Sequence, residues 1–183
     1  MRIRSSRLAA LITCLAIFLV SCASGSDAKG ISGRISSYVG DADYASSVSA
    51  LVYEQIPEED GRYGIVYRVV TDREGLLAQD EVPICLYFYS SMASGETSGI
   101  TAGVEDLAQM MSDKVLFVAV DGVTEKELGA RYGVEAYPEF VLLTPGQQPV
   151  MFEGMNYDMW TVNDVAVWME QNGYAPDRSR LEG

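Results

Sequence analysis

From residue 63 onward, short apolar runs alternate with amphipathic segments along the chain. The stretch 63–70 is rich in β-branched and aromatic residues and predicts a strand. Residues 82–89 and 115–120 are almost entirely apolar, which is typical of central strands that are covered on both faces. Two further strands are predicted over 140–144 and 150–153, joined by a Pro-Gly turn. These runs supply the strands of one sheet.

Helical patterns separate these strands. Thr71 is followed by Glu74 with the spacing of a capping box, which predicts a short helix that runs to about residue 79. A longer helix is predicted over 96–111, a short one over 124–133, and a last one over 161–172 with a glycine just beyond its end. Strands and helices alternate first, and a β-hairpin follows late in the chain. This order indicates an α/β fold, with a mixed sheet and helices on both faces.

The pattern ahead of the first strand is different. Tyr44, Val48, Leu51 and Val52 fall at i, i+4, i+7 and i+8, which predicts one amphipathic helix over about 43–55. We place this helix in an extension of the domain. The predicted organisation is a leader over 1–21, a tether and N-terminal extension over 22–60, a domain over 61–175 and a polar C-terminal tail over 176–183.

The first residues have the features of an export signal. Three arginines precede an apolar run over 8–20, too short for a comfortable membrane span. The run ends in Leu19-Val20-Ser21-Cys22, which resembles the bacterial lipobox. The resemblance implies cleavage before Cys22 and lipidation of its sulfur, so that the protein would be extracytoplasmic and anchored to a bacterial membrane. The alternative is an ordinary secretory signal that happens to end in cysteine.

Cysteine and histidine usage restricts the chemistry. Cys14 leaves with the leader and Cys22 carries the lipid, so only Cys85 remains, and one thiol cannot close an intramolecular disulfide. The sequence has no histidine, which excludes His-based acid–base catalysis and His metal ligands. The formal net charge of −13 disfavours nucleic acid as a partner. It leaves open either a merely solvated surface or one that attracts basic partners.

Several strings, in this order, resemble the thioredoxin family. Phe88-Tyr89-Ser90-Ser91-Met92 is similar to the family's Phe-Trp-Ala-x-Trp stretch ahead of Cys-Gly-Pro-Cys. Val120-Asp121, followed by the segment from Ala130 to Pro138, is similar to the family's Val-Asp and Tyr-Gly-Val-x-x-x-Pro. The resemblance covers residues 63–173. It implies a thioredoxin-like fold with a central mixed sheet of four to five strands and helices on both faces.

The sequence departs from the family at the redox site. In register, the family's Cys-Gly-Pro-Cys falls on the four residues from Ala93 to Glu96. The family's buried acid falls on Tyr87 and the nearby lysine on Phe117. Both thiols and the proton relay are therefore missing, and the resemblance implies a member without dithiol chemistry. Cys85 lies inside an apolar run, where we expect it to behave as a small buried hydrophobe rather than as a reactive thiol.

Two residues keep alternative interpretations. Pro138 matches the family's cis-proline, and the alternative is a trans proline that starts an edge strand. Glu96 is at a helix start, where an acid is favourable, and the alternative is a contact to a ligand or partner.

The leading hypothesis is a protein- or peptide-binding adaptor module without catalytic residues, cofactor or metal. In the family, the loop ahead of the cis-proline presents backbone groups to an extended peptide, and this surface does not need the thiols. An enzyme with non-dithiol chemistry, or a structural component of the cell envelope, are the alternatives, and the sequence leaves enzymatic activity open. Apart from the membrane at Cys22, the expected partner is a protein or an extended peptide. The candidate binding residues are Tyr89, Met92, Ala93, Glu96, Tyr137, Pro138 and Gly154.

Overall fold

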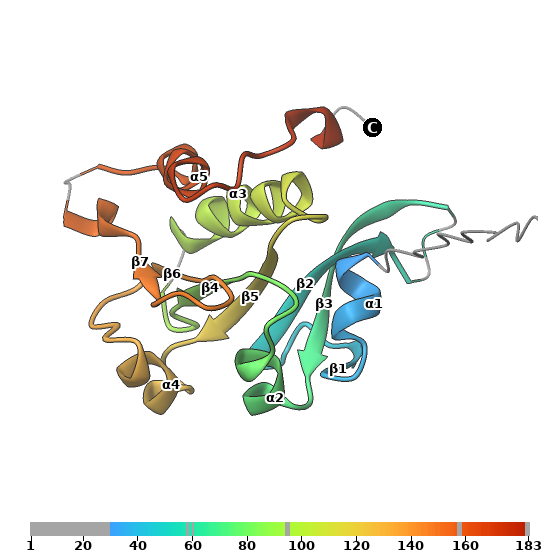
Figure 1. Ribbon diagram of the computed structural model, residues 1–183, viewed down its shortest axis with the longest axis horizontal. Coiled ribbons are helices and arrows are strands. Elements are labelled where there is room, and N and C mark those ends of the chain that lie inside the picture. Colours follow the sequence, from blue (N-terminus) through green and yellow to red (C-terminus); the bar gives the residue numbers. More distant parts are fainter. Residues whose placement is uncertain (1–29, 58, 60, 94–95, 157–158, 182–183) are drawn as a thin grey trace, which may run out of the picture.

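The structure is a computed structural model that describes residues 30–57, 59, 61–93, 96–156 and 159–181. These residues form one mixed sheet between two layers of helices (Figure 1). In chain order the elements are α1 (Ile31–Ile35), β1 (Val39–Ala42), β2 (Val48–Gln55), β3 (Tyr63–Val70), α2 (Arg73–Ala78), β4 (Ile84–Tyr89), α3 (Glu96–Met110), β5 (Leu116–Asp121), α4 (Lys126–Arg131), β6 (Glu139–Leu143), β7 (Val150–Met151), the 3-10 helix η1 (Glu153–Asn156), α5 (Val162–Gln171) and the 3-10 helix η2 (Arg178–Leu181).

The sheet confirms the predicted α/β class. From β3 onward the elements follow the predicted order of strands and helices. The strand order in the sheet is β1-β3-β2-β5-β4-β6-β7, with β4 and β5 parallel and every other neighbouring pair antiparallel. The described residues therefore form seven strands, whereas four to five were expected. The two extra strands are β1 and β2.

Strand β2 corrects the predicted helix over 43–55. It pairs with β3 on one side and with β5 on the other, so this part of the assigned N-terminal extension lies inside the sheet. All residues from Val48 to Val52 are buried, with Leu51 in one core layer and Val52 in the other. A strand covered on both faces loses its alternation, and a short apolar run of this kind matches helical spacing by coincidence.

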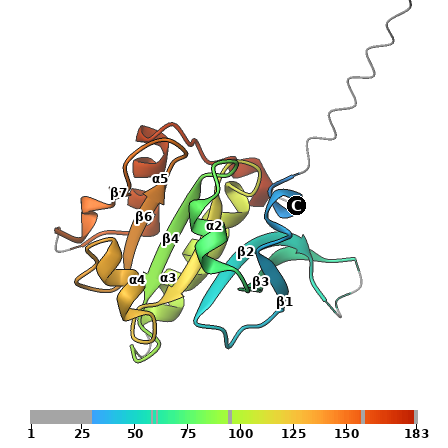
Figure 2. The same ribbon diagram turned by 60° about the horizontal axis from the view of Figure 1, so that its bottom comes forward.

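The helices divide between the two faces of the sheet. One face is covered by α3 and α5, which bury Leu107 and Trp168 against the sheet. The other face is covered by α1, α2 and α4, of which α2 and α4 bury Leu76 and Leu128 (Figure 2). The central strands β4 and β5 are thus enclosed on both faces, as their apolar sequences predicted.

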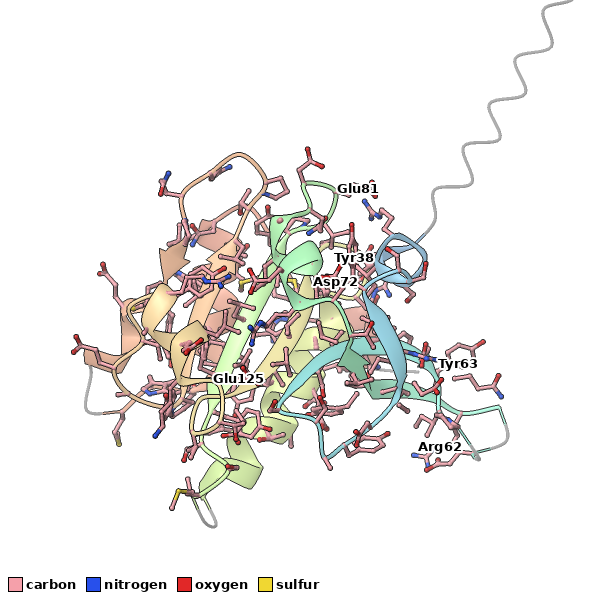
Figure 3. The ribbon with its side chains drawn as sticks, turned by 90° about the horizontal axis from the view of Figure 1, so that it is seen from below. Tyr38, Arg62, Tyr63, Asp72, Glu81 and Glu125 are labelled. Atoms are coloured by element: carbon pink, nitrogen blue, oxygen red, sulfur yellow. The ribbon has the colours of Figure 1, made fainter. Side chains whose placement is uncertain are left out.

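Acidic side chains precede α2 and α4 and make different contacts at the two helix starts. The N-cap of α2 is Asp72, whose carboxylate accepts a hydrogen bond from the N–H of Gly75 at 2.9 Å, and not Thr71 as predicted (Figure 3). Glu125, just ahead of α4, accepts hydrogen bonds from Ser47 Oγ at 2.6 Å and from Arg73 Nη1 at 2.7 Å. Its carboxylate therefore joins α4 to α2 and to the residues that lead into β2.

The segment assigned as a polar C-terminal tail packs on the domain where the structure describes it. The N–H of Asp177 donates to the carbonyl of Met110 at the end of α3, at 3.0 Å. Arg180, in η2, donates to Ser112 Oγ at 2.7 Å and pairs with Asp113 at 3.2 Å. These contacts hold η2 beside α3.

Substitutions in β2 test whether this strand is an integral part of the core. Leu51→Ala removes a side chain that is buried beneath α3, and we expect it to lower the free energy of unfolding by about 2–5 kcal/mol in a denaturant melt. Gln55→Ala, at the exposed end of the same strand, is the control and is expected to change stability by less than about 0.5 kcal/mol. Equal free energies of unfolding for the two variants would contradict the placement of Leu51 in the core.

Candidate functional site

The candidate site lies where β4 and β5 end. The two strands are parallel, so their carboxyl ends meet at one edge of the sheet, and Tyr89 is paired with Asp121 in their register. Residues 90–93 follow β4 and lead toward α3, which begins at Glu96. The antiparallel pairing of Phe88 with Glu139, extended by one residue, places Pro138 opposite Tyr89.

The buried carboxylate of Asp121 organises this edge. It accepts hydrogen bonds from Ser91 Oγ at 2.9 Å and from Ser91 N–H at 3.2 Å. It also accepts from Thr124 Oγ1 at 2.7 Å and from Val123 N–H at 3.1 Å. Burial by itself raises the pKa of Asp121, yet these four hydrogen bonds outweigh it and hold the pKa below its usual value. Asp121 therefore stays ionised and fixes the loop after β4 to the loop after β5.

Gly122 connects Tyr89 with Tyr137. Its N–H donates to the carbonyl of Tyr89 at 2.8 Å, and its own carbonyl accepts a hydrogen bond from the Tyr137 hydroxyl at 2.8 Å. A side chain at Gly122 would overlap the Tyr137 ring, so this close approach requires glycine. The peptide bond between Tyr137 and Pro138 is cis, the form that the family resemblance implied for this proline.

The loop after β4 presents its side chains to solvent. Ser91, Met92 and Ala93 are exposed, and 80% of the Met92 surface is accessible. The backbone nevertheless is held, because Asp121 binds Ser91 and the N–H of Ala93 donates to the carbonyl of Ser90 at 3.2 Å. The result is an exposed apolar side chain on an anchored loop.

Gly154 lies outside the hydrogen-bond network that joins the loops of Tyr89 and Tyr137. It sits in η1, where the Phe152 ring packs so closely that a side chain at residue 154 would overlap it. It lines a groove formed with α5 rather than contributing a contact to the Asp121 network. The structure thus joins Tyr89, Tyr137 and Pro138 and places Met92 and Ala93 on the adjoining loop.

Cys85 and the two residues at the family's proton-relay positions, Tyr87 and Phe117, all lie in the apolar core. Cys85 has no exposed surface, and burial raises the pKa of its thiol. Tyr87 is buried and stacks on Phe140 with ring centroids 5.1 Å apart, while its hydroxyl lies 3.5 Å from Thr101 Oγ1. Phe117 is fully buried in the same core layer. No ionisable acid or lysine therefore occupies either relay position.

Cys22 and the whole leader lie outside the described residues, so anchoring stays a prediction. Among the residues that the structure describes, no helix is long and apolar enough to cross a bilayer. The same part of the chain holds no group of three or more acidic or cysteine side chains suited to a metal ion.

Sequence reasoning missed Glu139, the residue after Pro138. Its side chain is buried at the start of β6, and burial raises the pKa of its carboxyl although the N–H of Phe140 donates to it at 2.8 Å. The signal in the sequence was a lone acid at the head of an apolar run, directly after a proline at the candidate site. Only the tertiary structure shows that this acid is buried, at the position where β6 pairs with Phe88.

Comparison with known proteins agrees with this fold. A family model described as Thioredoxin matches residues 69–164, more than half of the chain. Among solved structures, the first thioredoxin domain of mouse protein disulfide-isomerase A4 is 20% identical, over 54% of this chain and 67% of that one, with a TM-score of 0.45. The Deadhead thioredoxin of Drosophila melanogaster is 23% identical, over 55% and 88%, with a TM-score of 0.42. Thioredoxin of Fasciola hepatica is 24% identical, over 55% and 89%, with a TM-score of 0.43. The family assignment therefore rests on the family model alone.

The buried acid at Glu139 predicts a pH-dependent stability. Since the folded-state pKa is raised, ionisation of Glu139 destabilises the fold as the pH rises from the ordinary value of about 4.3 through the folded-state pKa. Glu139→Gln keeps an acceptor for the Phe140 N–H but cannot ionise. We expect the variant to exceed the parent in free energy of unfolding at about pH 8, with the difference shrinking toward about pH 4.

Chemical denaturation across this pH range measures the difference for Glu139→Gln. Glu135→Gln, an exposed acid in the same loop, is the control and should follow the parent at every pH. A Glu139→Gln effect that stays constant with pH would contradict the assignment of a raised pKa to Glu139.

Proposed function

The chain belongs to the thioredoxin family, and from that premise we propose that it is an extracytoplasmic, lipid-anchored binding module without dithiol redox activity. The observation that carries the proposal is that the part of the chain described by the structure offers no accessible thiol. Ala93 and Glu96 stand where the family has its two cysteines, and Cys85 is completely buried. The nucleophile in disulfide exchange is the thiolate, and burial disfavours that form of Cys85.

The residues at the family's proton-relay positions support the same proposal. Exchange in this fold needs a group that moves a proton beneath the active-site helix. At the matching positions this chain has Tyr87, whose pKa is raised by burial, and Phe117, which cannot ionise. Thiols and proton relay are thus replaced together by side chains that pack.

The loop geometry supports a binding role. Asp121 and Gly122 fix the backbone that carries Tyr89, Tyr137 and Met92, so that little ordering would be required on association. Methionine adapts to varied apolar partners, and Met92 projects into solvent. An extended peptide that runs along the Tyr137–Pro138 segment would meet an anchored tyrosine and an adaptable methionine. Glu96, at the start of α3, is proposed as a further contact.

A disulfide-reduction assay tests the redox claim. We expect that the parent protein does not accelerate insulin reduction above the background of added dithiothreitol. The double variant Ala93→Cys, Glu96→Cys restores both thiols at the start of α3 and is expected to gain activity, because a helix N-terminus stabilises a thiolate. The single variant Ala93→Cys is the control and should lack turnover. Parent activity that disappears in Cys85→Ser would refute redox inactivity.

Photo-crosslinking tests the binding role of the loop. A photoreactive benzoylphenylalanine in place of Met92, in the full chain expressed in its host, is expected to give a discrete protein adduct. The same residue in place of Glu127, exposed on α4, is the control site and should not give that adduct. If both sites yield the same products, or Met92 yields none, the loop is not a docking surface.

Replacement of Cys22 tests the anchor. Lipidation contributes about 0.8 kcal/mol per buried CH₂ group, and stable anchoring requires more than one chain. Cys22→Ala should therefore abolish labelling by a fatty-acid probe and release the protein into the soluble extracytoplasmic fraction. Cys85→Ser is the matched control and should stay with the membrane. Unchanged membrane association of Cys22→Ala would remove the lipoprotein part of the proposal.

A further inference from the structure

A groove of about 600 Å³ runs between the last strand of the sheet and the last long helix. Its lining residues come from β7 and η1 on one side and from α5 on the other. Figure 1 shows where these elements lie in the fold. Strand β7 is the terminal strand of the described sheet and pairs only with β6. The groove is thus formed by different elements from the loops around Asp121.

The floor of the groove is aromatic. Phe152 contacts Trp160 with ring centroids 5.7 Å apart, and Trp168 with centroids 5.6 Å apart. Behind them, Phe140 packs edge-on against both Phe152 and Trp160. This packing holds the aromatic rings in place, so the floor exists before anything binds.

The sides of the groove expose apolar side chains. Met159 has 91% of its surface accessible, Val167 43% and Val150 36%. Val167 lies on α5 and lines the groove. Exposed aliphatic groups next to an aromatic floor mark a surface that gains from being covered by an apolar partner.

The charges in the groove have one sign. Its lining residues include two acids, Glu153 and Asp164, and no lysine or arginine. Hydrogen bonds from the N–H and hydroxyl of Thr161 lower the pKa of Asp164, which therefore stays ionised at neutral pH. The whole chain is acidic as well, with a net charge of −13. An occupant of the groove must therefore tolerate or complement negative charge.

We propose that this groove binds an apolar peptide segment flanked by lysine or arginine, contributed by a partner protein. Aliphatic side chains of the segment would cover Val167 and Met159. Its cationic groups would pair with Glu153 and Asp164 and stack on the partly exposed ring of Trp160, since cations favour tryptophan rings. Negative charge excludes anionic occupants such as nucleic acid. This goes beyond the proposed function, because the groove is separate from the Met92 loop.

The two tryptophans of the chain report directly on the groove. Trp160 and Trp168 are the only tryptophans in the sequence, and both line it. Titration of the purified full chain with acetyl-Lys-Leu-Lys-Leu-Lys-amide is expected to shift tryptophan emission to shorter wavelength with a saturable isotherm. The matched peptide with glutamate in place of lysine should give no saturable shift. Added salt should weaken binding of the lysine peptide, because it screens exposed charge pairs.

Two variants and a control localise the binding. Val167→Lys places a cation in the groove, and Glu153→Gln removes one carboxylate. Each variant is therefore expected to bind the lysine peptide with an affinity lower by about tenfold or more. Glu170→Gln, an exposed acid on α5 outside the groove, changes the net charge equally and should bind like the parent. Met92→Ala should also bind like the parent, which separates this proposal from the loop proposal.

The other outcomes overturn the assignment. Equal binding of the lysine and glutamate peptides would show that apolar contact alone drives binding. A comparable shift with tetramethylammonium would show a site for a small cation rather than for a peptide. Parent-like binding by both Val167→Lys and Glu153→Gln, or no saturable shift with the lysine peptide, would remove the groove as a binding site.

Discussion

The parallel pairing of β4 with β5 is the constraint on which the candidate site depends. It sets Tyr89 beside Asp121 at the point where both strands leave the sheet. From there Asp121 binds Ser91 on one loop and Thr124 on the other, and Gly122 joins Tyr89 to Tyr137. A slip of one residue in this register would turn the side chain of Asp121 to the other face and undo all of these contacts.

The interior beneath α3 is built to pack rather than to transfer protons. Cys85, Tyr87 and Phe117 belong to one core layer that also contains Phe140. Tyr87 stacks on Phe140 and on Tyr89, so aromatic contacts fill the place where the family uses ionisable groups. A second buried acid near the loop, Glu139, accepts a hydrogen bond from the backbone N–H of Phe140 at the start of β6. The proposed lack of dithiol chemistry is consistent with this continuous aromatic core.

The same aromatic residues connect the loop with the groove. Phe140 stacks on Tyr87 toward the Met92 loop and packs edge-on against Phe152 and Trp160 toward the groove. The two proposed surfaces thus rest on one rigid cluster but draw their exposed side chains from different elements. The loop can be altered at Met92 and the groove at Val167 without removing an aromatic ring from that cluster, because both side chains are exposed.

The sequence by itself determined the class of fold, because long apolar runs for β4 and β5, separated and flanked by helical patterns, leave few other arrangements. It also marked the residues of the loop and of the cis-proline segment, since short strings in a fixed order carry the family resemblance. Only the tertiary structure decided that 48–55 is a central strand, because a run buried on both faces has no period of its own. The Asp121 network, the buried Glu139 and the groove beside α5 likewise depend on which distant residues the sheet brings together, and no local pattern encodes those distances.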